Sequence, residues 1–377
     1  MAKEEADMKS RAARKRMMPL RSWLLAVMAL LLLPLGGCGF VDIDKRFFVV
    51  AVAIDKSGSE QKPYRITLRL SIPNSKIEPG MEKSQVETIE AAEISEGVRR
   101  IKALLDKELD LGHCKMFVLG KKLSHDDISD AVDWMVRRRD IQGSAYVAMA
   151  GSQGYDILQK MPLSERYSGN SLFLTFGGDG TRSSYIRTEH LFDLQRRRTE
   201  RGMDPYLPVI RTTGNGYEVD RLALLDKTKV RTILTPEETQ LFNQLDQQYV
   251  NSIIKTKLDG HPIILTATDI SSRYTVSSNG ILKMKVNIAG AIEEAPNNVF
   301  NQDWGELQKM FERDLEKDAM ALFQKIQKAG VDPFGFGLRY RATHLSSRAY
   351  QEWLEMYPRL KFEIQAKVKI QGTGLIK

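Results

Sequence analysis

The chain has 377 residues, with 56 Lys and Arg against 48 Asp and Glu and a formal net charge of +8. The first 37 residues hold 7 of these bases and 3 of the acids, which leaves 49 against 45 for the other 340 residues. Little of the basic charge therefore belongs to the body of the protein, which argues against a nucleic-acid-binding function. A body of this length exceeds what one hydrophobic core usually organises and favours more than one domain.

The N-terminus resembles a bacterial lipoprotein leader. Basic residues precede the apolar run 23–33, which ends at Pro34 and is shorter than the about 20 residues that a membrane-spanning helix needs. Leu35-Gly36-Gly37-Cys38 follows, in which two small residues suit a narrow protease site and the thiol accepts a diacylglyceryl group. We therefore expect cleavage between Gly37 and Cys38 and an N-palmitoyl, S-diacylglycerol Cys38. The alternatives are an uncleaved anchor helix and an ordinary signal peptide with an incidental cysteine.

The first part of the mature chain alternates predicted strands and helices. Residues 47–54 form a continuous apolar run and predict a buried strand. In residues 64–70 the apolar side chains fall on even positions, which predicts a strand with one buried and one exposed face. Residues 73–87 are polar and predict an exposed connection, and 89–109 have apolar residues at helical spacing.

The same alternation continues to residue 150. Residues 116–119 predict a strand, the spacing over 128–136 predicts an amphipathic helix, and 145–150 predict another strand. This order favours an α/β protein with mixed sheets packed against helices. Residues from about 161 to 216 are less periodic and predict linking structure or a small middle domain.

A second α/β region is expected at the C-terminus, from residue 213 to 377. The apolar stretch 222–225 is taken as its beginning, and Thr235 followed by Pro236 is typical of a helix start. The remaining elements are a strand around 282–288, a long helix over 303–328 and a final alternating strand over 362–370, which we expect to pair deep in the fold. The predicted regions are thus the leader 1–37, an N-terminal region 38–212 and this C-terminal region.

Catalytic and metal-binding patterns find little support in the sequence. The histidines are far apart and form no pair at i and i+4, so we expect no metal site and no cofactor; they are His113, His125, His190, His261 and His344.

Two other sequence features have ordinary structural explanations. The loop Gly177-Gly178-Asp179-Gly180-Thr181 resembles a phosphate-binding loop, but a solvated tight turn explains it better. Cys114 is expected to be a small buried thiol. Arg196-Arg197-Arg198 is expected to lie on a solvated helix face, with contact to anionic headgroups as the alternative.

Several stretches together resemble the Ger(x)C family of spore germination lipoproteins, and they cover nearly all of the mature chain. The chain departs from the family at Gly39-Phe40-Val41, where an acidic start is common, and at Cys114, which replaces an aliphatic residue. The stretches are 48–55, Leu111-Gly-His-Cys-Lys-Met-Phe-Val-Leu-Gly120, Arg139-Asp-Ile-Gln-Gly-Ser-Ala-Tyr-Val147, Asp204-Pro-Tyr-Leu-Pro-Val-Ile210, Asp332-Pro-Phe-Gly-Phe-Gly337, Trp353, Tyr357-Pro358 and Gly374-Leu-Ile376.

This resemblance implies a non-catalytic subunit of a spore nutrient germinant receptor. Its expected partners are the A and B membrane subunits and the membrane itself, on the extracytoplasmic face of the spore inner membrane. The subunit would act as a scaffold required for nutrient-triggered germination. The alternative is a lipid-anchored solute-binding protein that captures the nutrient directly, which would need two lobes around a cleft with convergent polar groups.

Overall fold

The computed structural model of the chain describes residues 23–24, 45–71, 84–162, 165, 169–176, 183–247, 251–297, 299 and 302–373. The chain divides into two units, Met1–Lys45 and Arg46–Lys377, and the sheets belong to the second. The leader residues 35–38 and the glycine-rich loop 177–181 lie outside the described residues. In the described part, no helix is both long and apolar enough to cross a membrane.

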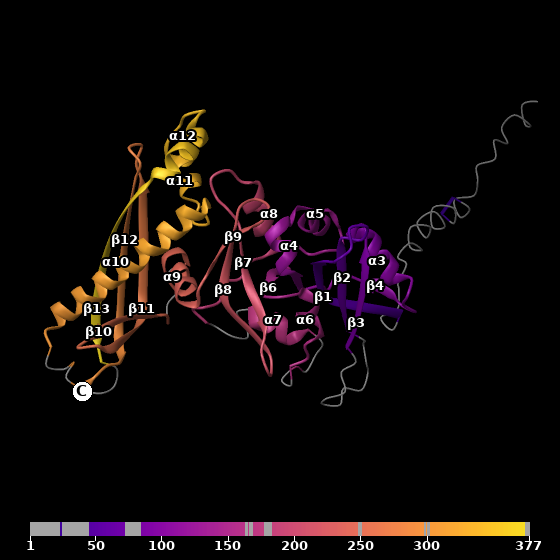
Figure 1. The fold of residues 1–377 in the computed structure, drawn as a ribbon, viewed down its shortest axis with the longest axis horizontal. Helices are drawn as coiled ribbons and strands as arrows, with labels where there is room; N and C mark the ends of the chain where they lie inside the picture. The colour runs from indigo at the N-terminus through magenta and orange to yellow at the C-terminus, as the bar shows by residue number, and fades with distance from the viewer. Residues whose placement is uncertain are drawn as a thin grey trace, which may run out of the picture. The chain divides into compact units, whose positions relative to one another are not determined.

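Within these ranges, the first sheet has nine strands in the order β3-β2-β1-β5-β6-β7-β8-β9, and β4 pairs with β1 (Figure 1). Strands β1, β5, β6 and β7 are parallel, and antiparallel strands extend the sheet on both sides. The strands are β1 (Arg46–Lys56), β2 (Tyr64–Ser71), β3 (Ser84–Ala91), β4 (Glu108–Asp110), β5 (Met116–Leu119), β6 (Tyr146–Ala150), β7 (Tyr206–Thr212), β8 (Tyr217–Leu225) and β9 (Val230–Leu234).

Helices cover both faces of the first sheet, and each face has its own core. One face packs against α3 (Ile94–Lys102), α4 (Lys121–Asp126), α5 (Ser129–Arg137) and α8 (Leu191–Thr199). The other packs against α6 (Gly154–Gln159) and α7 (Asn170–Phe176). Burial on both sides explains why β1 is a continuous apolar run: Val49 and Ile54 enter one core, and Ala51 and Ala53 enter the other.

The strands predicted at 47–54, 116–119 and 145–150 and the helix predicted at 128–136 are confirmed. The predicted exposed face of β2 is wrong, because Thr67 and Arg69 are fully buried. The Arg69 guanidinium pairs with the Glu165 carboxylate, and it also donates to the Lys160 carbonyl at 3.0 Å. An ion pair between residues so far apart in the chain cannot be predicted from the alternation of polar and apolar residues along a strand.

The region between β2 and β5 also differs from expectation. The predicted connection 73–87 includes the start of β3, and the predicted helix over 89–109 shortens to α3, with β3 before it and β4 after it. The polar side chains of β3 lie at an outer strand of the sheet, where exposure is tolerated. Polarity alone therefore did not distinguish a loop from an outer strand.

The second sheet has the order β10-β11-β12-β13, with β12 and β13 parallel and the other pairs antiparallel. Its elements are α9 (Pro236–Gln247), β10 (Ile253–Leu258), β11 (His261–Val276), β12 (Ile281–Glu294), α10 (Trp304–Ala329), α11 (Phe336–Thr343), α12 (Ala349–Met356), the 3₁₀ turn η4 (Tyr357–Arg359) and β13 (Lys361–Gly372). The predicted α/β class is confirmed. The predicted division at residue 213 stays a prediction; β8 and β9, which follow it, pair in the first sheet.

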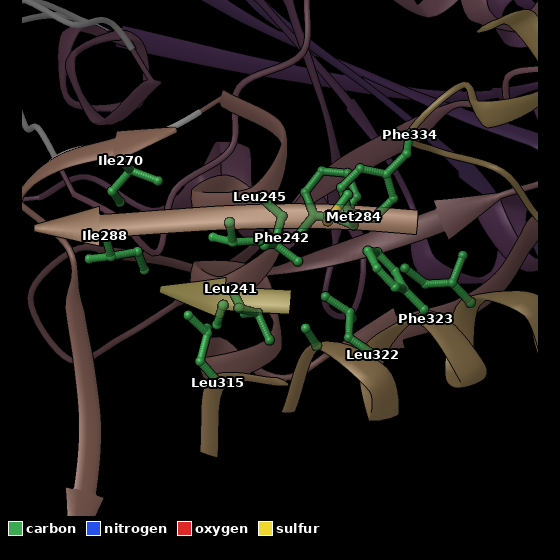
Figure 2. Close-up of a cluster of buried hydrophobic side chains, with 14 of the residues drawn as sticks. Leu241, Phe242, Leu245, Ile270, Met284, Ile288, Leu315, Leu322, Phe323 and Phe334 are labelled. Atoms are coloured by element: carbon green, nitrogen blue, oxygen red, sulfur yellow. The ribbon is translucent and has the colours of Figure 1, made fainter. Parts of the chain in front are cut away.

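One face of the second sheet packs against helices. Figure 2 shows side chains of α9, α10, β11 and β12 converging on a shared core, with Phe242, Met284 and Phe323 among them. The predicted helix starts are confirmed: Thr235 and Glu238 form a capping box before α9, and the Asp303 side chain caps α10. The long helix predicted over 303–328 is also confirmed as α10, and its apolar stripe is buried at Leu307, Phe311, Leu315, Leu322, Phe323 and Ile326.

The final strand is expected from its sequence to pair deep in the fold, but β13 pairs with β12 alone and forms an edge of its sheet. Helix α10 protects this edge with a ladder of side-chain acceptors. The backbone N–H groups of Ala366, Val368 and Ile370 donate at 2.8, 3.0 and 2.9 Å to Glu316, Glu312 and Gln308, respectively. Steps of four residues along a helix and two along a strand have similar lengths of about 6 Å, so the ladder keeps its register.

Removing the acceptors of this ladder should expose the strand edge. In the double variant Glu312→Ala and Glu316→Ala, two edge N–H groups lose their partners, and we expect a loss of about 1 kcal/mol for each in urea unfolding. An unprotected edge also favours pairing between chains, so size-exclusion chromatography should show association. The matched control, Glu312→Gln and Glu316→Gln, keeps amide oxygens as acceptors, as Gln308 already does. Equal behaviour of the two double variants would contradict the ladder's role.

Candidate functional site: the junction of the two sheets

Two loops join the sheets through reciprocal hydrogen bonds. The Asp332 N–H donates to the Asp204 carboxylate at 2.7 Å, and the Asp204 N–H donates to the Asp332 carbonyl at 2.8 Å. The Leu338 N–H donates to the Gly202 carbonyl at 2.6 Å, and Arg341 pairs with Glu200 at 2.8 Å. The segment 332–337 is thereby docked onto the loop 202–204 that leads into β7. We call these two segments the junction loops.

Glycines at the junction allow the backbones to approach closely. Gly202 has a φ of +86°, and a Cβ there would lie 2.5 Å from the carbonyl carbon of Gly337. A Cβ on Gly337 would lie 2.3 Å from Nε1 of Trp353, and Gly335 has a φ of +73°. Both space and backbone conformation exclude a side chain at Gly202, space excludes one at Gly337, and backbone conformation disfavours one at Gly335.

The Asp332 side chain starts helix α11. Its two oxygens accept from the N–H groups of Phe336 at 3.0 Å and Gly337 at 2.7 Å. Burial raises the pKa of Asp332 to about 7, against the lowering effect of these N–H donors, and nearby Asp204 raises it further. The carboxyl is therefore a structural cap whose charge is disfavoured by its surroundings.

Buried arginines form the second part of the junction. Arg187 donates to the Tyr206 hydroxyl at 2.8 Å and to Asp246 of α9 at 2.5 Å. Arg197 donates to the Pro333 carbonyl at 3.0 Å, and its guanidinium lies 4.3 Å from the centre of the Tyr206 ring. Both arginines thus connect the first sheet to residues of the C-terminal half.

In the arginine run 196–198, Arg196 lies on an exposed helix face as expected, but the other two arginines do not. Arg197 is 6% exposed and pairs with Glu189 and Asp193, so it lies neither on a solvated face nor at a headgroup. Arg198 pairs with Asp133 of α5 at 3.1 Å. Burial raises the pKa of Glu189 to about 8, against the lowering effect of Arg197. Sequence alone did not reveal the carboxyl groups of Glu189, Asp193 and Asp133 that surround this run.

A second polar site lies where β1, β5 and β6 end. The Asp55 carboxylate is 2% exposed and accepts from the N–H groups of Gly154 and Tyr155 at 2.7 and 2.9 Å. Burial raises the pKa of Asp55 despite these donors. A cavity of about 340 Å³ beside it is lined by Lys56, Arg65, Lys121 and Lys122 among others. Asp55 already fills the position that an anion would take at the start of α6, so this site is internally satisfied.

An apolar groove of about 320 Å³ lies between α9, β10 and α10. Leu241, Ile254, Phe311 and Leu322 line it, with charged groups at its rim. Its buried amides, Gln240 and Gln244, already donate to Ser184 and Ser252. The groove thus offers mainly apolar contact, and its two buried amides are already hydrogen-bonded.

Two families of sequences match the chain in succession. Residues 39–212 match the family described as "Spore germination protein N-terminal domain", and residues 220–374 match "Spore germination B3/GerAC like, C-terminal". Together they span most of both sheets and the junction loops. The chain belongs to the Ger(x)C family of spore germination proteins.

Known proteins support this assignment. This Ger(x)C protein is 23% identical over 276 residues to spore germination protein GerQC of Bacillus cereus, covering 71% of this chain and 76% of the relative. It is 23% identical over 370 residues to the putative spore germination protein YfkR of Bacillus subtilis strain 168, covering 91% and 94%. The crystal structure of the GerBC protein has the same fold, with a TM-score of 0.58, 20% identity, and coverage of 85% of this chain and 96% of that one.

The structure explains several residues that carried the resemblance. Phe334 and Phe336 stack on each other, with ring centres 5.1 Å apart, inside the core of the second sheet. Trp353 lies against Gly337, and the Tyr357 hydroxyl donates to the Val331 carbonyl at 2.5 Å. The motif 332–337 and the aromatic residues after it therefore form one packed unit.

The remaining residues considered in the sequence analysis are Cys114, the candidate metal ligands and Cys38. Cys114 is fully buried as expected, and burial raises the pKa of its thiol to about 12. Among the described residues, no group of three or more His, Cys, Asp or Glu side chains is arranged to hold a metal ion. The expected lipidation site, Cys38, lies outside the described residues.

A methyl group at Gly202 should destabilise this Ger(x)C protein. The variant Gly202→Ala forces a Cβ against Gly337 at a positive φ, and we expect a loss of about 2 kcal/mol or more in urea unfolding. Gly214→Ala is the control, since a Cβ there meets nothing within 4 Å and needs no positive φ. A Gly202→Ala protein as stable as the control would contradict the close contact.

The Asp332 carboxyl should make stability depend on pH. Its folded-state pKa of about 7 is above its unfolded value of 3.8, so its contribution is fully present below about pH 4. Because the unfolded chain loses this proton first, the contribution falls as the pH rises from about 4 to 7. We therefore expect the stability advantage of wild type over Asp332→Asn to shrink across this range in urea titrations. An advantage that grows with pH would contradict this assignment.

Proposed function

We propose that this protein is a non-catalytic, lipid-anchored subunit of a spore nutrient germinant receptor. The match of both halves of the chain to spore germination families carries the proposal. In this proposal the leader 1–37 is removed, and an acylated Cys38 holds the body on the extracytoplasmic face of the spore inner membrane. The regions 38–212 and 213–377 then act together as a scaffold for the A and B membrane subunits.

The junction loops support a scaffolding role. The two sheets are connected by reciprocal backbone hydrogen bonds, a buried aspartate and two buried arginines, so a force on one sheet is transmitted to the other. The motif 332–337 is fully used in this contact. The polar groups inside the protein hold its two sheets in a fixed arrangement. A body fixed in this way can position partner subunits.

The lipid anchor is tested with the variant Cys38→Ala. We expect loss of the protein from the spore membrane fraction and slower nutrient-triggered germination, because cleavage and acylation both require this thiol. The control variant Gly36→Ala keeps a small residue before the cleavage site and should behave as wild type. Fractionation followed by immunoblotting, with mass spectrometry of the mature N-terminus, gives the readout.

Two results would count against the proposal. Unchanged membrane retention of Cys38→Ala, or a wild-type N-terminus with a free thiol, would exclude the lipid anchor. Micromolar nutrient binding by the isolated body in calorimetry would favour direct solute capture over scaffolding.

A further inference from the structure

The second sheet has one face that no helix covers in the described part of the chain. Along β12 the even positions from Leu282 to Ile288 are buried in the core, whereas Lys283, Lys285 and Asn287 are exposed. Strand β13 alternates in the same sense, and its register places Lys283 beside Glu363 and Asn287 beside Lys367. The odd positions of both strands therefore share the open face.

Exposed charges of both signs lie on these strands. On β11, β12 and β13 the acids are Asp269, Glu363 and, at the end of β12, Glu293 and Glu294, all exposed. The exposed cations outnumber them and define what we call the cationic face: Arg273, Lys283, Lys285, Lys361, Lys367 and Lys369.

The arrangement of these charges is unfavourable for the isolated protein. Arg273 on β11 lies directly opposite Lys285 on β12, and like charges in such a position destabilise a sheet. Lys367 is the diagonal neighbour of Lys285, and Lys369 is the next residue on the same face. Among the described residues, Lys283 is the one cation of this face that forms an ion pair, with Glu363 at 2.9 Å. An anionic partner would relieve this repulsion.

We propose that the cationic face docks against the anionic headgroups of a lipid bilayer. The attraction is electrostatic and needs no inserted side chain, since each Lys or Arg near an anionic surface favours binding roughly fivefold. The inference rests on the proposed function for the location of the protein beside a membrane. The charges themselves belong to the folded body and do not depend on that location.

The composition of the face favours a membrane over an acidic protein. The centres of protein interfaces are enriched in aromatic residues, Met and Arg and are depleted in Lys. Lysines are five of the six cations of this face, and none of the large exposed apolar side chains of the described chain lies on β11, β12 or β13. A mobile ammonium group suits many interchangeable phosphates better than one fixed carboxylate.

The test uses the chain from Gly39 onward without a lipid, because Arg46–Lys377 is one compact unit with its own cores. The protein is mixed with vesicles of phosphatidylcholine alone or with phosphatidylglycerol added, and the bound fraction is measured by sedimentation. The test variant is Lys285→Gln, Lys367→Gln and Lys369→Gln. The control, Arg313→Gln, Lys317→Gln and Lys328→Gln, removes equal charge from exposed positions of α10.

We expect wild type and control to bind the anionic vesicles, and the test variant to bind about a hundredfold more weakly. Binding should fall as salt is added. The melting temperature of the test variant should equal or exceed that of wild type, since like-charge repulsion is removed.

Three outcomes would overturn the proposal. They are equal losses in test variant and control, equal binding to both kinds of vesicle, and no vesicle binding by wild type, the last of which would point to an acidic protein. None of these results depends on acylation of Cys38, so failure here is distinguishable from failure of the lipid anchor.

Discussion

The paired hydrogen bonds between Asp204 and Asp332 fix two loops on which the rest of the C-terminal half depends. Once Asp332 is held, its carboxyl starts α11, and the two phenylalanines that follow turn into the core of the second sheet. Burying a carboxyl costs free energy that its N–H donors offset only in part, as its raised pKa indicates. The contact therefore specifies how the halves meet more than it stabilises them.

Sequence reasoning succeeded where local pattern and burial agree. The stripe of α10, the capping box at Thr235 and the alternation of β12 each depend on residues close in the chain. Strand β1 was also predicted, because burial on two faces produces an apolar run that needs no partner to be recognised. The α/β class followed from these elements.

The failures share one physical cause, which is pairing between residues far apart in the chain. Arg69 is buried because Glu165 reaches it, and Arg197 because Glu189 and the Pro333 carbonyl surround it. The local sequence around each of these two arginines does not distinguish it from an exposed arginine. The junction was present in the sequence only as the motif 332–337, whose glycines mark a close backbone approach without saying to what.

In the second sheet the β13 edge is covered by hydrogen-bond acceptors, whereas the cationic face is not covered, and this difference bears on function. Its β13 edge would pair with any extended chain, and α10 closes it with acceptors at matched spacing. On the open face of the same strand, Lys367 and Lys369 form no ion pair with a described residue, whereas Glu363 pairs with Lys283. Protection of this edge disfavours backbone pairing with another chain along β13. Retention of unpaired charge on the face beside it is then best explained by a contact that is electrostatic, reversible and directed at an anionic surface.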